Sequence, residues 1–348
     1  MKIEPAIKTL ILPRRAGVGS QLGRYELLSR VACGGMASVW AAREKGAGRE
    51  RLVAVKMVLP DLAGSEFEAM FLEEARLAAL IQHPNVCRIF ELIDQQGILA
   101  LAMEWIDGGT LATLLAASTA CGPLDPRVTA GILAQVACGL HAAHELRDAK
   151  GVGMQLVHRD VSPQNVLIGR DGRVAVTDFG VAKALGRAGG ATAVGTIKGK
   201  LAYMSPEQVN GDSVDRRSDI FALGVVLYMA TVGTHPFRRP GEPQRQMFTR
   251  LSEPLTPPSE LAPGYPAELE AIVARALQRN PDQRFATAEE LRSELCGWLS
   301  RSGPALGAAE IAAAVHERLG PAKVVPLDGV AHAERPTVIP GRKGLPTG

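Results

Sequence analysis

The sequence predicts an α+β protein with two parts, a small β-rich part followed by a larger α-rich part. The chain has 348 residues, of which 46% are apolar, enough for one large hydrophobic core or two smaller ones. Residues 25–106 contain short runs rich in β-branched or aromatic side chains, separated by turns that contain glycine. After residue 107 the apolar side chains recur at helical spacing instead.

The first part is expected to form a small sheet with one helix. The runs "YELLSRVA", "ASVWAARE" and "RLVAVKMVL" predict three strands within residues 25–60. The segment "SEFEAMFLEEARLAALIQ" then places Phe67, Phe71, Ala75 and Ala78 at helical spacing, and "HPN" ends the helix. The runs "CRIFELID" and "ILALAMEWI" predict two more strands.

The second part is expected to be helical. Helices are predicted for "TLATLLAAS", "PRVTAGILAQVACGLHAAHEL", "IFALGVVLYMATVG", "PAELEAIVARAL" and "TAEELRSELCGWL". Beyond Trp298 the chain is rich in Gly, Pro and Ala, with one further short helix predicted in "AAEIAAAVHERL". The expected organisation is an N-terminal extension (1–24), a small lobe (25–106), a large lobe (107–300) and a loosely attached flexible tail (301–348).

Composition narrows the class of protein. The net charge of +3 is too small to indicate a nucleic-acid partner, and the basic residues near the N-terminus are expected to be solvated. The longest apolar run has about 14 residues, fewer than the ~20 that a membrane-spanning helix needs, and no secretion signal is recognised. No membrane partner is therefore expected. The five cysteines are widely spaced and form no C-x-x-C pair, which favours reduced thiols in a cytoplasmic protein.

Four short motifs occur in order along the chain: "VAVK" with Lys56, "HRDVSPQN" from His158 to Asn165, "TDFG" from Asp178 to Gly180, and "SPE" from Ser205 to Glu207. In this order and spacing they resemble the eukaryotic-type (Hanks-type) serine/threonine protein kinases of bacteria, from about Tyr25 to Leu299. The resemblance implies the two-lobed protein kinase fold. It also implies transfer of the γ-phosphoryl group of Mg-ATP to Ser or Thr hydroxyls of protein substrates, including other copies of this chain.

The resemblance gives roles to the charged residues of these motifs. Lys56 would contact the α- and β-phosphates, and Glu74 in "FLEEARL" would hold Lys56 in place, with its neighbour Glu73 as the alternative. Asp160 would accept the proton of the attacking hydroxyl. Such residues suit phosphoryl transfer, because its catalysis depends on positioning and on neutralising charge at the γ-phosphate.

Asn165 and Asp178 would bind magnesium, which prefers oxygen ligands. Asp and Asn also cap loops in many proteins, but that alternative does not account for the joint spacing of the motifs. The resemblance gives four further residues a structural role rather than a catalytic one: His158, Asp219, Glu207 and Arg284.

The resemblance also outlines a nucleotide site. Met103 would guard the back of an adenine pocket lined by Val39 and Ala54, and the backbones of Glu104 and Ile106 would bind the base edge. Aligned on the pattern G-x-G-x-x-G, the phosphate loop includes Ala32, Cys33, Gly34 and Gly35. Only its middle glycine, Gly34, is kept, so a lower ATP affinity is expected. Cys33 is interpreted as a small side chain rather than a reactive thiol.

Two features concern regulation and catalysis. Thr192 and Thr196 lie in a glycine-rich stretch, and a phosphate on Thr196 is expected to bind Arg159, which precedes the catalytic aspartate. Ser162 stands where the family usually has a lysine near the γ-phosphate, and Lys200 stands where it usually has a threonine. We expect Lys200 to supply the missing charge, the alternative being a lysine that faces solvent or an acidic peptide.

Two other functions stay open at this point. A pseudokinase could keep the fold without catalysis, although it would have no chemical need of both metal ligands. An adaptor could act through the tail and the basic N-terminus. The segment "LAYMSPE", with Tyr203, resembles serine/threonine kinases more than tyrosine kinases.

Overall fold

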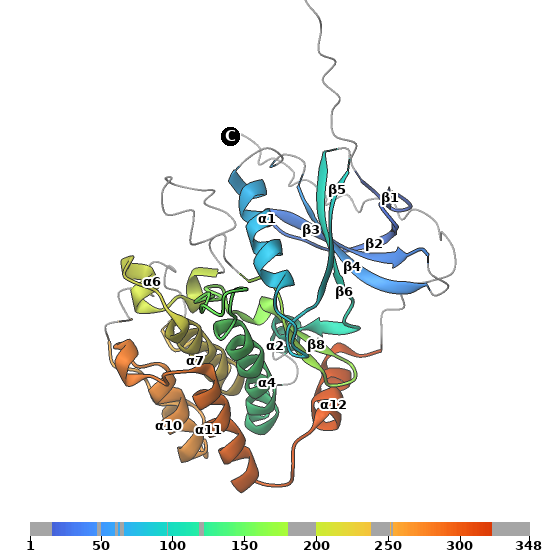
Figure 1. Cartoon of the computed structure of the whole chain (residues 1–348). Helices are drawn as coiled ribbons and strands as arrows, with labels where there is room; N and C mark the ends of the chain where they lie inside the picture. Colours follow the sequence, from blue (N-terminus) through green and yellow to red (C-terminus); the bar gives the residue numbers. More distant parts are fainter. Residues whose placement is uncertain are drawn as a thin grey trace, which may run out of the picture.

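The protein folds into two lobes, as the sequence predicts (Figure 1). The computed structural model describes residues 16–46, 50–59, 62, 66–95, 97–117, 122–179, 200–237, 251 and 253–321. The upper lobe contains a sheet and one long helix, and the lower lobe contains most of the helices and a small second sheet. Residues 104–107, which we call the hinge, join the last strand of the upper sheet to the first strand of the lower one.

The upper sheet has six strands in the order β1-β2-β3-β4-β6-β5, and every neighbouring pair is antiparallel. Its two edges approach each other, because the Gly23 amide donates to the Gln95 side chain at 2.6 Å and the Tyr25 hydroxyl donates to Glu91 at 3.0 Å. The strands are β1 (Gln21–Leu22), β2 (Tyr25–Cys33), β3 (Ala37–Glu44), β4 (Arg51–Val58), β5 (Ile89–Gln95) and β6 (Ile98–Glu104).

Helix α1 (Glu66–Ala79) packs on one face of this sheet. Phe71 and Ala75 are buried there against Ala54, Leu101 and Met103, as their helical spacing predicts. The side chain of Phe67 lies outside the described residues. Strand β1 falls within the stretch expected to be an extension, and Leu22 is buried, so the small lobe begins before residue 25.

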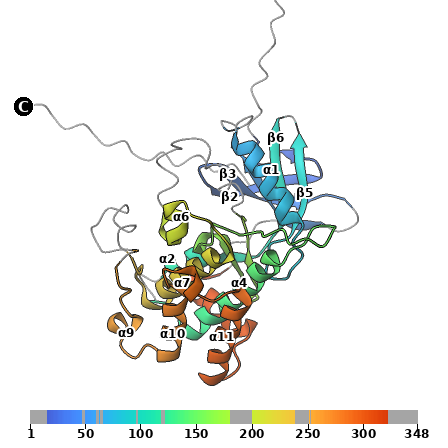
Figure 2. The same ribbon diagram turned by 60° about the vertical axis from the view of Figure 1, so that its left-hand side comes forward.

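The lower lobe is built around α4 (Pro126–His144) and α7 (Arg216–Val232). Helix α7 starts where the Asp215 carboxylate accepts the Arg217 amide at 2.8 Å, and it ends at Gly233, whose φ of 84° glycine adopts readily. Figure 2 shows these helices below the sheet, with α10 and α11 packed beside them. The other helices of eight residues or more are α10 (Ala267–Ala276), α11 (Ala288–Arg301) and α12 (Ala308–Leu319).

Short strands and helices complete the lower lobe. The second sheet has the order β7-β8-β9, with β7 (Gly108–Thr110), β8 (Val166–Gly169) and β9 (Val174–Val176). Gly108 is required at its first position, because a Cβ there would lie 2.0 Å from the carbonyl oxygen of Ile168. The short helices of the described ranges are α2 (Leu111–Ala116), η2 (Pro163–Asn165), η4 (Lys200–Tyr203), α6 (Pro206–Asn210), α9 (Pro258–Leu261) and η5 (Pro281–Gln283).

Residues 301–321 differ from the loose tail expected after residue 300. The expected short helix is present as α12, but it is docked on the large lobe, where Ile311 and Val315 are buried. The sequence did not reveal this because Gly- and Pro-rich flanks are typical of tails. None of the helices in the described ranges is long and apolar enough to cross a membrane.

Candidate active site

Lys56, on the central strand β4, lies between two carboxylates from other elements. Its ammonium is 3.2 Å from Glu74 of α1 and 2.9 Å from Asp178, which follows β9. Of the two glutamates considered from the sequence, Glu74 is therefore the one that contacts Lys56. Burial by itself lowers the pKa of Lys56, but the charges of Asp178 and Glu74 outweigh it and hold the pKa above its ordinary value. Lys56 is thus a permanent cation at the boundary of the lobes.

Asp160 lies in a loop whose backbone is held by buried side chains. The carboxylate of Asp219, on α7, accepts the amides of His158 and Arg159, each at 2.8 Å, and a ring nitrogen of His144 at the same distance. The φ of Arg159 is +62°, a conformation that costs a non-glycine residue free energy. Asp219 therefore braces the loop in a conformation that the chain does not favour by itself.

His158 connects this loop to the segment before Asp178. Its Nδ1 accepts the amide of Asp160 at 3.2 Å, and its Nε2–H donates to the carbonyl of Thr177 at 3.1 Å. Burial lowers the pKa of His158, so the neutral imidazole that this arrangement requires is favoured. The ring also contacts Phe179, with centroids 4.6 Å apart. The geometry suits the structural role expected for His158.

Asn165 and Asp178 are brought together by the backbone, because the amide of Thr177 donates to the carbonyl of Asn165 at 3.0 Å. The Asn165 side-chain amide donates to the Asp160 carbonyl at 2.8 Å and to its carboxylate at 3.2 Å. Its Oδ1 is therefore directed away from Asp160 and is available as a metal ligand. Asp178 also has a positive φ, of +59°. In the described ranges no three His, Cys, Asp or Glu side chains form a metal-binding group.

Gln208, which the sequence did not single out, also holds the loop that contains Asp160. Its side-chain NH₂ donates to the carbonyl of Arg159 at 3.0 Å, while its oxygen accepts the Ser205 amide at 3.1 Å. Ser205 and Gln208 form the capping box of α6. The pattern S-x-x-Q in "SPEQ" was the available signal, since it is typical of a helix start.

The residues expected around the base lie in one apolar cluster between the lobes. Val39, Ala54 and Met103 from the upper sheet share this cluster with Leu167 of β8, which comes from the lower lobe. Leu167 was missed because an alternating apolar residue in a short strand looks the same whether it packs in a core or lines a site. The cluster indicates an apolar surface on both sides of the expected nucleotide pocket.

The hinge presents its backbone beside this cluster. The Glu104 amide is already bonded to the Arg88 carbonyl at 2.8 Å. The Glu104 carbonyl accepts the Cys87 thiol, a weak donor, at 3.8 Å, so of the two backbone groups of Glu104 the carbonyl is the one suited to a ligand. The Ile106 amide donates to none of the residues in the described ranges. The Glu104 side chain is bound by Arg173, which also donates to the Pro84 carbonyl at 3.0 Å.

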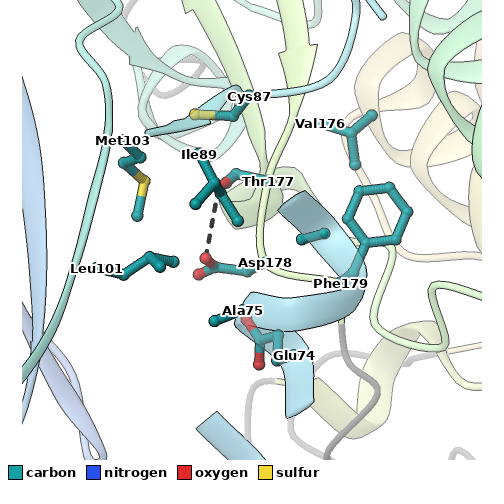
Figure 3. A pocket seen from close by; sticks show the side chains of 11 residues that line it. Glu74, Ala75, Cys87, Ile89, Leu101, Met103, Val176, Thr177, Asp178 and Phe179 are labelled. Atoms are coloured by element: carbon teal, nitrogen blue, oxygen red, sulfur yellow. Dashed lines mark hydrogen bonds between the residues drawn. The ribbon is translucent and has the colours of Figure 1, made fainter. Parts of the chain in front are cut away.

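A pocket opens behind Met103, between β6, α1 and the segment that ends at Phe179 (Figure 3). Figure 3 shows Met103 and Leu101 facing Asp178 and Phe179 across it, with Glu74 below. Cys87 lines the top of the pocket. Burial raises the pKa of its thiol to about 12, so this cysteine stays protonated and unreactive near neutral pH.

The loop between β2 and β3 closes as a tight hairpin. The Gly34 amide donates to the Ala37 carbonyl at 2.9 Å, and Ala32 pairs with Val39 across the strands. A Cβ at Gly34 would lie 3.6 Å from the Ala37 oxygen, an ordinary contact, so packing inside the loop does not require this glycine. Cys33 is an exposed free thiol at the start of the turn. Gly35 lies in the same turn.

The residues expected to take part in regulation and in supplying a cation are only partly within the described ranges. Thr192 and Thr196 fall outside the described residues, as does the side chain of Lys200, whose backbone begins η4. The guanidinium of Arg159 makes no hydrogen bond or ion pair with another residue of the described ranges. The hydroxyl of Ser162 is buried and has no hydrogen-bond partner among them.

Glu207 and Arg284 form a buried ion pair below the site. The two nitrogens of Arg284 lie 2.7 and 2.8 Å from the two oxygens of Glu207, and Ser218 donates to the same carboxylate. Burial alone raises the pKa of Glu207, but these hydrogen bonds and the charge of Arg284 outweigh it and lower the pKa. The pair ties α6 to the helical core, as expected for a structural role.

Comparison with known proteins gives a family. The profile described as "Protein kinase domain" matches residues 25–295. The chain is 40% identical to "Tyrosine-protein kinase MasK" of Myxococcus xanthus over 86% of this chain and 46% of that protein. It is 34% identical to "Serine/threonine-protein kinase PrkC" of Bacillus subtilis over 78% of this chain and 40% of that protein. It thus spans less than half the length of these curated relatives.

Solved structures agree on the fold. A crystal structure of the PknI kinase domain of Mycobacterium tuberculosis is 25% identical and has a TM-score of 0.61. The match covers 82% of this chain and 99% of that domain. The resemblance carried by the motifs and the predicted two-lobed fold are therefore confirmed. This chain belongs to the protein kinase domain family.

Proposed function

We propose that this chain is an active protein kinase that transfers the γ-phosphoryl group of Mg-ATP to Ser or Thr hydroxyls of proteins. The observation that carries the proposal is the position of Lys56, which pairs with Glu74 from one side and with Asp178 from the other. A cation fixed in this way between the lobes is suited to bind phosphate groups, which Glu74 and Asp178 position it to meet.

The residues around Lys56 have complementary roles in this proposal. Asp160, directed by Asn165 and by the braced loop, accepts the proton of the attacking hydroxyl. The Glu104 carbonyl and the Ile106 amide bind the edge of the base, and the cluster of Val39, Ala54, Met103 and Leu167 packs on its faces.

Asn165 and Asp178 would hold magnesium. A carboxylate and an amide oxygen fit this ion, which usually takes one or two protein ligands together with substrate phosphates and water. When bound, the ion would neutralise charge on the phosphates. The presence of both Asn165 and Asp178 argues against a pseudokinase, because a scaffold without catalysis has no need of two metal ligands.

A tyrosine acceptor is a second candidate. MasK, the relative with 40% identity, is named a tyrosine kinase, and Ser162 replaces the lysine expected two residues after Asp160. The names of PrkC and of PknB of Mycobacterium tuberculosis, 36% identical, favour Ser and Thr, as does Tyr203 before the SPE motif.

Phosphoamino-acid analysis decides between these acceptors. The purified chain is incubated with γ-labelled ATP and magnesium, hydrolysed, and its labelled residues are identified, with Asp160→Asn as the blank. We expect phosphoserine and phosphothreonine that are absent from the blank. Label on tyrosine alone would replace the proposal by the second candidate, and label that persists in the blank would overturn both.

Regulation by phosphorylation is part of the proposal. The guanidinium of Arg159 has no hydrogen bond or ion pair with the described residues, and a phosphate on Thr196 would give it charge-assisted hydrogen bonds. Mass spectrometry of the active protein is expected to find phosphate on Thr196 or Thr192, and Thr196→Ala is expected to reduce activity. An unphosphorylated segment together with a fully active Thr196→Ala protein would refute this mode of regulation.

A further inference from the structure

Helix α12 lies beyond the end of the matched kinase domain, yet the large lobe is shaped to receive it. Its Ile311 and Val315 are buried. Two glycines of the lobe leave room for this segment. A Cβ at Gly131 would lie 2.4 Å from Leu306, and one at Gly172 would lie 1.9 Å from the Ala308 carbonyl oxygen. Such close approach, by the Leu306 side chain at Gly131 and by the Ala308 backbone at Gly172, indicates a specific packing rather than an incidental one.

Polar contacts hold the end of α12 beside α2. The guanidinium of Arg318 donates to the carbonyls of Leu114, Gly122 and Pro123, at 3.3, 3.0 and 2.8 Å. These carbonyls belong to helix α2 and to the segment before α4. Figure 1 shows α12 below the small sheet, next to β8. The helix therefore fixes the elements that directly follow the hinge.

The turn between β8 and β9 (residues 170–173) connects α12 to both ends of the hinge. At one end, Arg173 binds the Glu104 carboxylate. At the other end, the Arg170 amide donates to the Asp107 carbonyl at 2.8 Å. Arg170 is in turn held by α12, because its guanidinium donates to the Gly320 carbonyl at 2.7 Å and its own carbonyl accepts the His316 ring N–H at 3.2 Å.

A direct apolar contact complements this connection. Leu319, in the last turn of α12, packs over Gly109 of β7, where a Cβ would lie only 2.8 Å from a Leu319 methyl carbon. Gly109 is two residues beyond the hinge and directly precedes Thr110, the residue that caps α2. Leu319 thus covers the outer side of the chain just after the hinge.

We propose that α12 is a brace for the hinge, in which His316 and Leu319 are positioning residues that set the affinity for nucleotide. The inference rests on the proposed function, in which the Glu104 carbonyl and the Ile106 amide bind the base. Groups that are already ordered bind more tightly than groups that must be ordered on binding. A brace on the outer side of the hinge provides this order without touching the ligand.

The test compares variants on one helix. His316→Ala removes the bond to the Arg170 carbonyl, and Leu319→Ala removes the contact with Gly109. Glu317→Ala is the matched control, since Glu317 lies between them in sequence and is exposed. For each variant of the whole 348-residue chain, the Kd of Mg-ADP is measured by calorimetry. The melting temperature, kcat and the separate KM values for ATP and for a peptide substrate are measured on the same samples.

We expect the double variant His316→Ala/Leu319→Ala to raise the Kd of Mg-ADP and the KM for ATP by roughly fivefold or more. The KM for peptide and the kcat should stay within about twofold, and Glu317→Ala should match the wild type. A merely structural helix would lower the melting temperature without this split. An unchanged Kd in the double variant would overturn the brace alone, whereas a wild type that binds no nucleotide would overturn the proposed function with it.

Discussion

The upper and lower halves of the candidate active site are held by different kinds of interaction. In the upper half, three charged side chains from three elements meet, and those of Lys56, Glu74 and Asp178 are 13%, 18% and 34% exposed. In the lower half, buried side chains hold backbone groups, and Asp219 is 1% exposed. The upper half can therefore separate when α1 shifts, whereas the lower half changes only if the large lobe opens.

The largest effect is expected when a charge of either half is removed. Lys56→Met, Asp160→Asn and Asp178→Asn should each lower phosphoryl transfer by at least about 100-fold, because positioning and charge stabilisation carry this reaction. Rates are measured on purified proteins whose circular dichroism matches the wild type. Glu294→Gln, an exposed carboxylate on α11, is the control that should keep full activity. Retained activity in Asp160→Asn or Asp178→Asn would refute the assignments.

The two halves should differ in stability. Asp219→Asn leaves the amides of His158 and Arg159 and a ring nitrogen of His144 without their charged acceptor, so we expect a loss of about 3 kcal/mol in the free energy of unfolding. Glu74→Gln, in the partly exposed upper half, should cost less than about 1 kcal/mol while reducing activity about tenfold or more. Urea unfolding and kinase assays on both variants check this contrast. Equal stability losses would remove the distinction between the halves.

A smaller effect is expected where the chain departs from its family. Ser162 contributes no charge, and its hydroxyl has no partner among the described residues. If Lys200 supplies the missing cation, Lys200→Thr should reduce transfer by about tenfold, as for the loss of one charged contact to phosphate. Adding Ser162→Lys should restore much of the rate. A harmless Lys200→Thr, measured by initial rates at saturating ATP, would end this interpretation.

The smallest effect concerns pH and the neutral His158. Burial lowers its pKa in the folded protein, so below about pH 6.5 the unfolded chain binds more protons than the folded one. Above pH 6.5, His158 is neutral in both states and the folded protein keeps its full stability. The free energy of unfolding then decreases as the pH falls from 6.5 to the lowered pKa of the folded protein. Between pH 6.5 and the lowered pKa, we expect His158 to reduce the free energy of unfolding by up to about 1.4 kcal/mol per pH unit. Urea unfolding at several pH values should show a shallower acid slope in His158→Gln, and an identical slope would contradict the assignment.

The sequence predicted most of the fold and most residues of the candidate active site. The fold followed from periodicity, and the site residues followed from short motifs. Strand and helix periodicity placed Phe71 and Ala75 on the buried face of α1, because a buried helix face must repeat every three to four residues. The short motifs located Lys56, Asp160 and Asp178 because charge chemistry restricts residue type. The resemblance favoured Glu74 over its neighbour Glu73, and in the structure Glu74 is the residue that contacts Lys56.

Contacts between distant parts of the chain could not be predicted. The docking of α12 depends on small residues such as Gly131 and Gly172, whose only signal is the absence of a side chain. The links from Arg170 and Arg173 to the hinge look like exposed turn residues in the sequence. Such features follow from the three-dimensional arrangement and have no periodicity or motif of their own.

The most direct test of the account is transfer of label from γ-labelled ATP by the purified chain in the presence of magnesium, beside Asp160→Asn. Both proteins are also tested for nucleotide binding, because Asp160 is proposed to act on the attacking hydroxyl and not to bind the base. We predict that the wild type incorporates label, that Asp160→Asn incorporates at least about 100-fold less, and that both bind nucleotide. Nucleotide binding without transfer by the wild type, or equal transfer by both proteins, would contradict the claim that Asp160 makes this chain a catalytically active kinase.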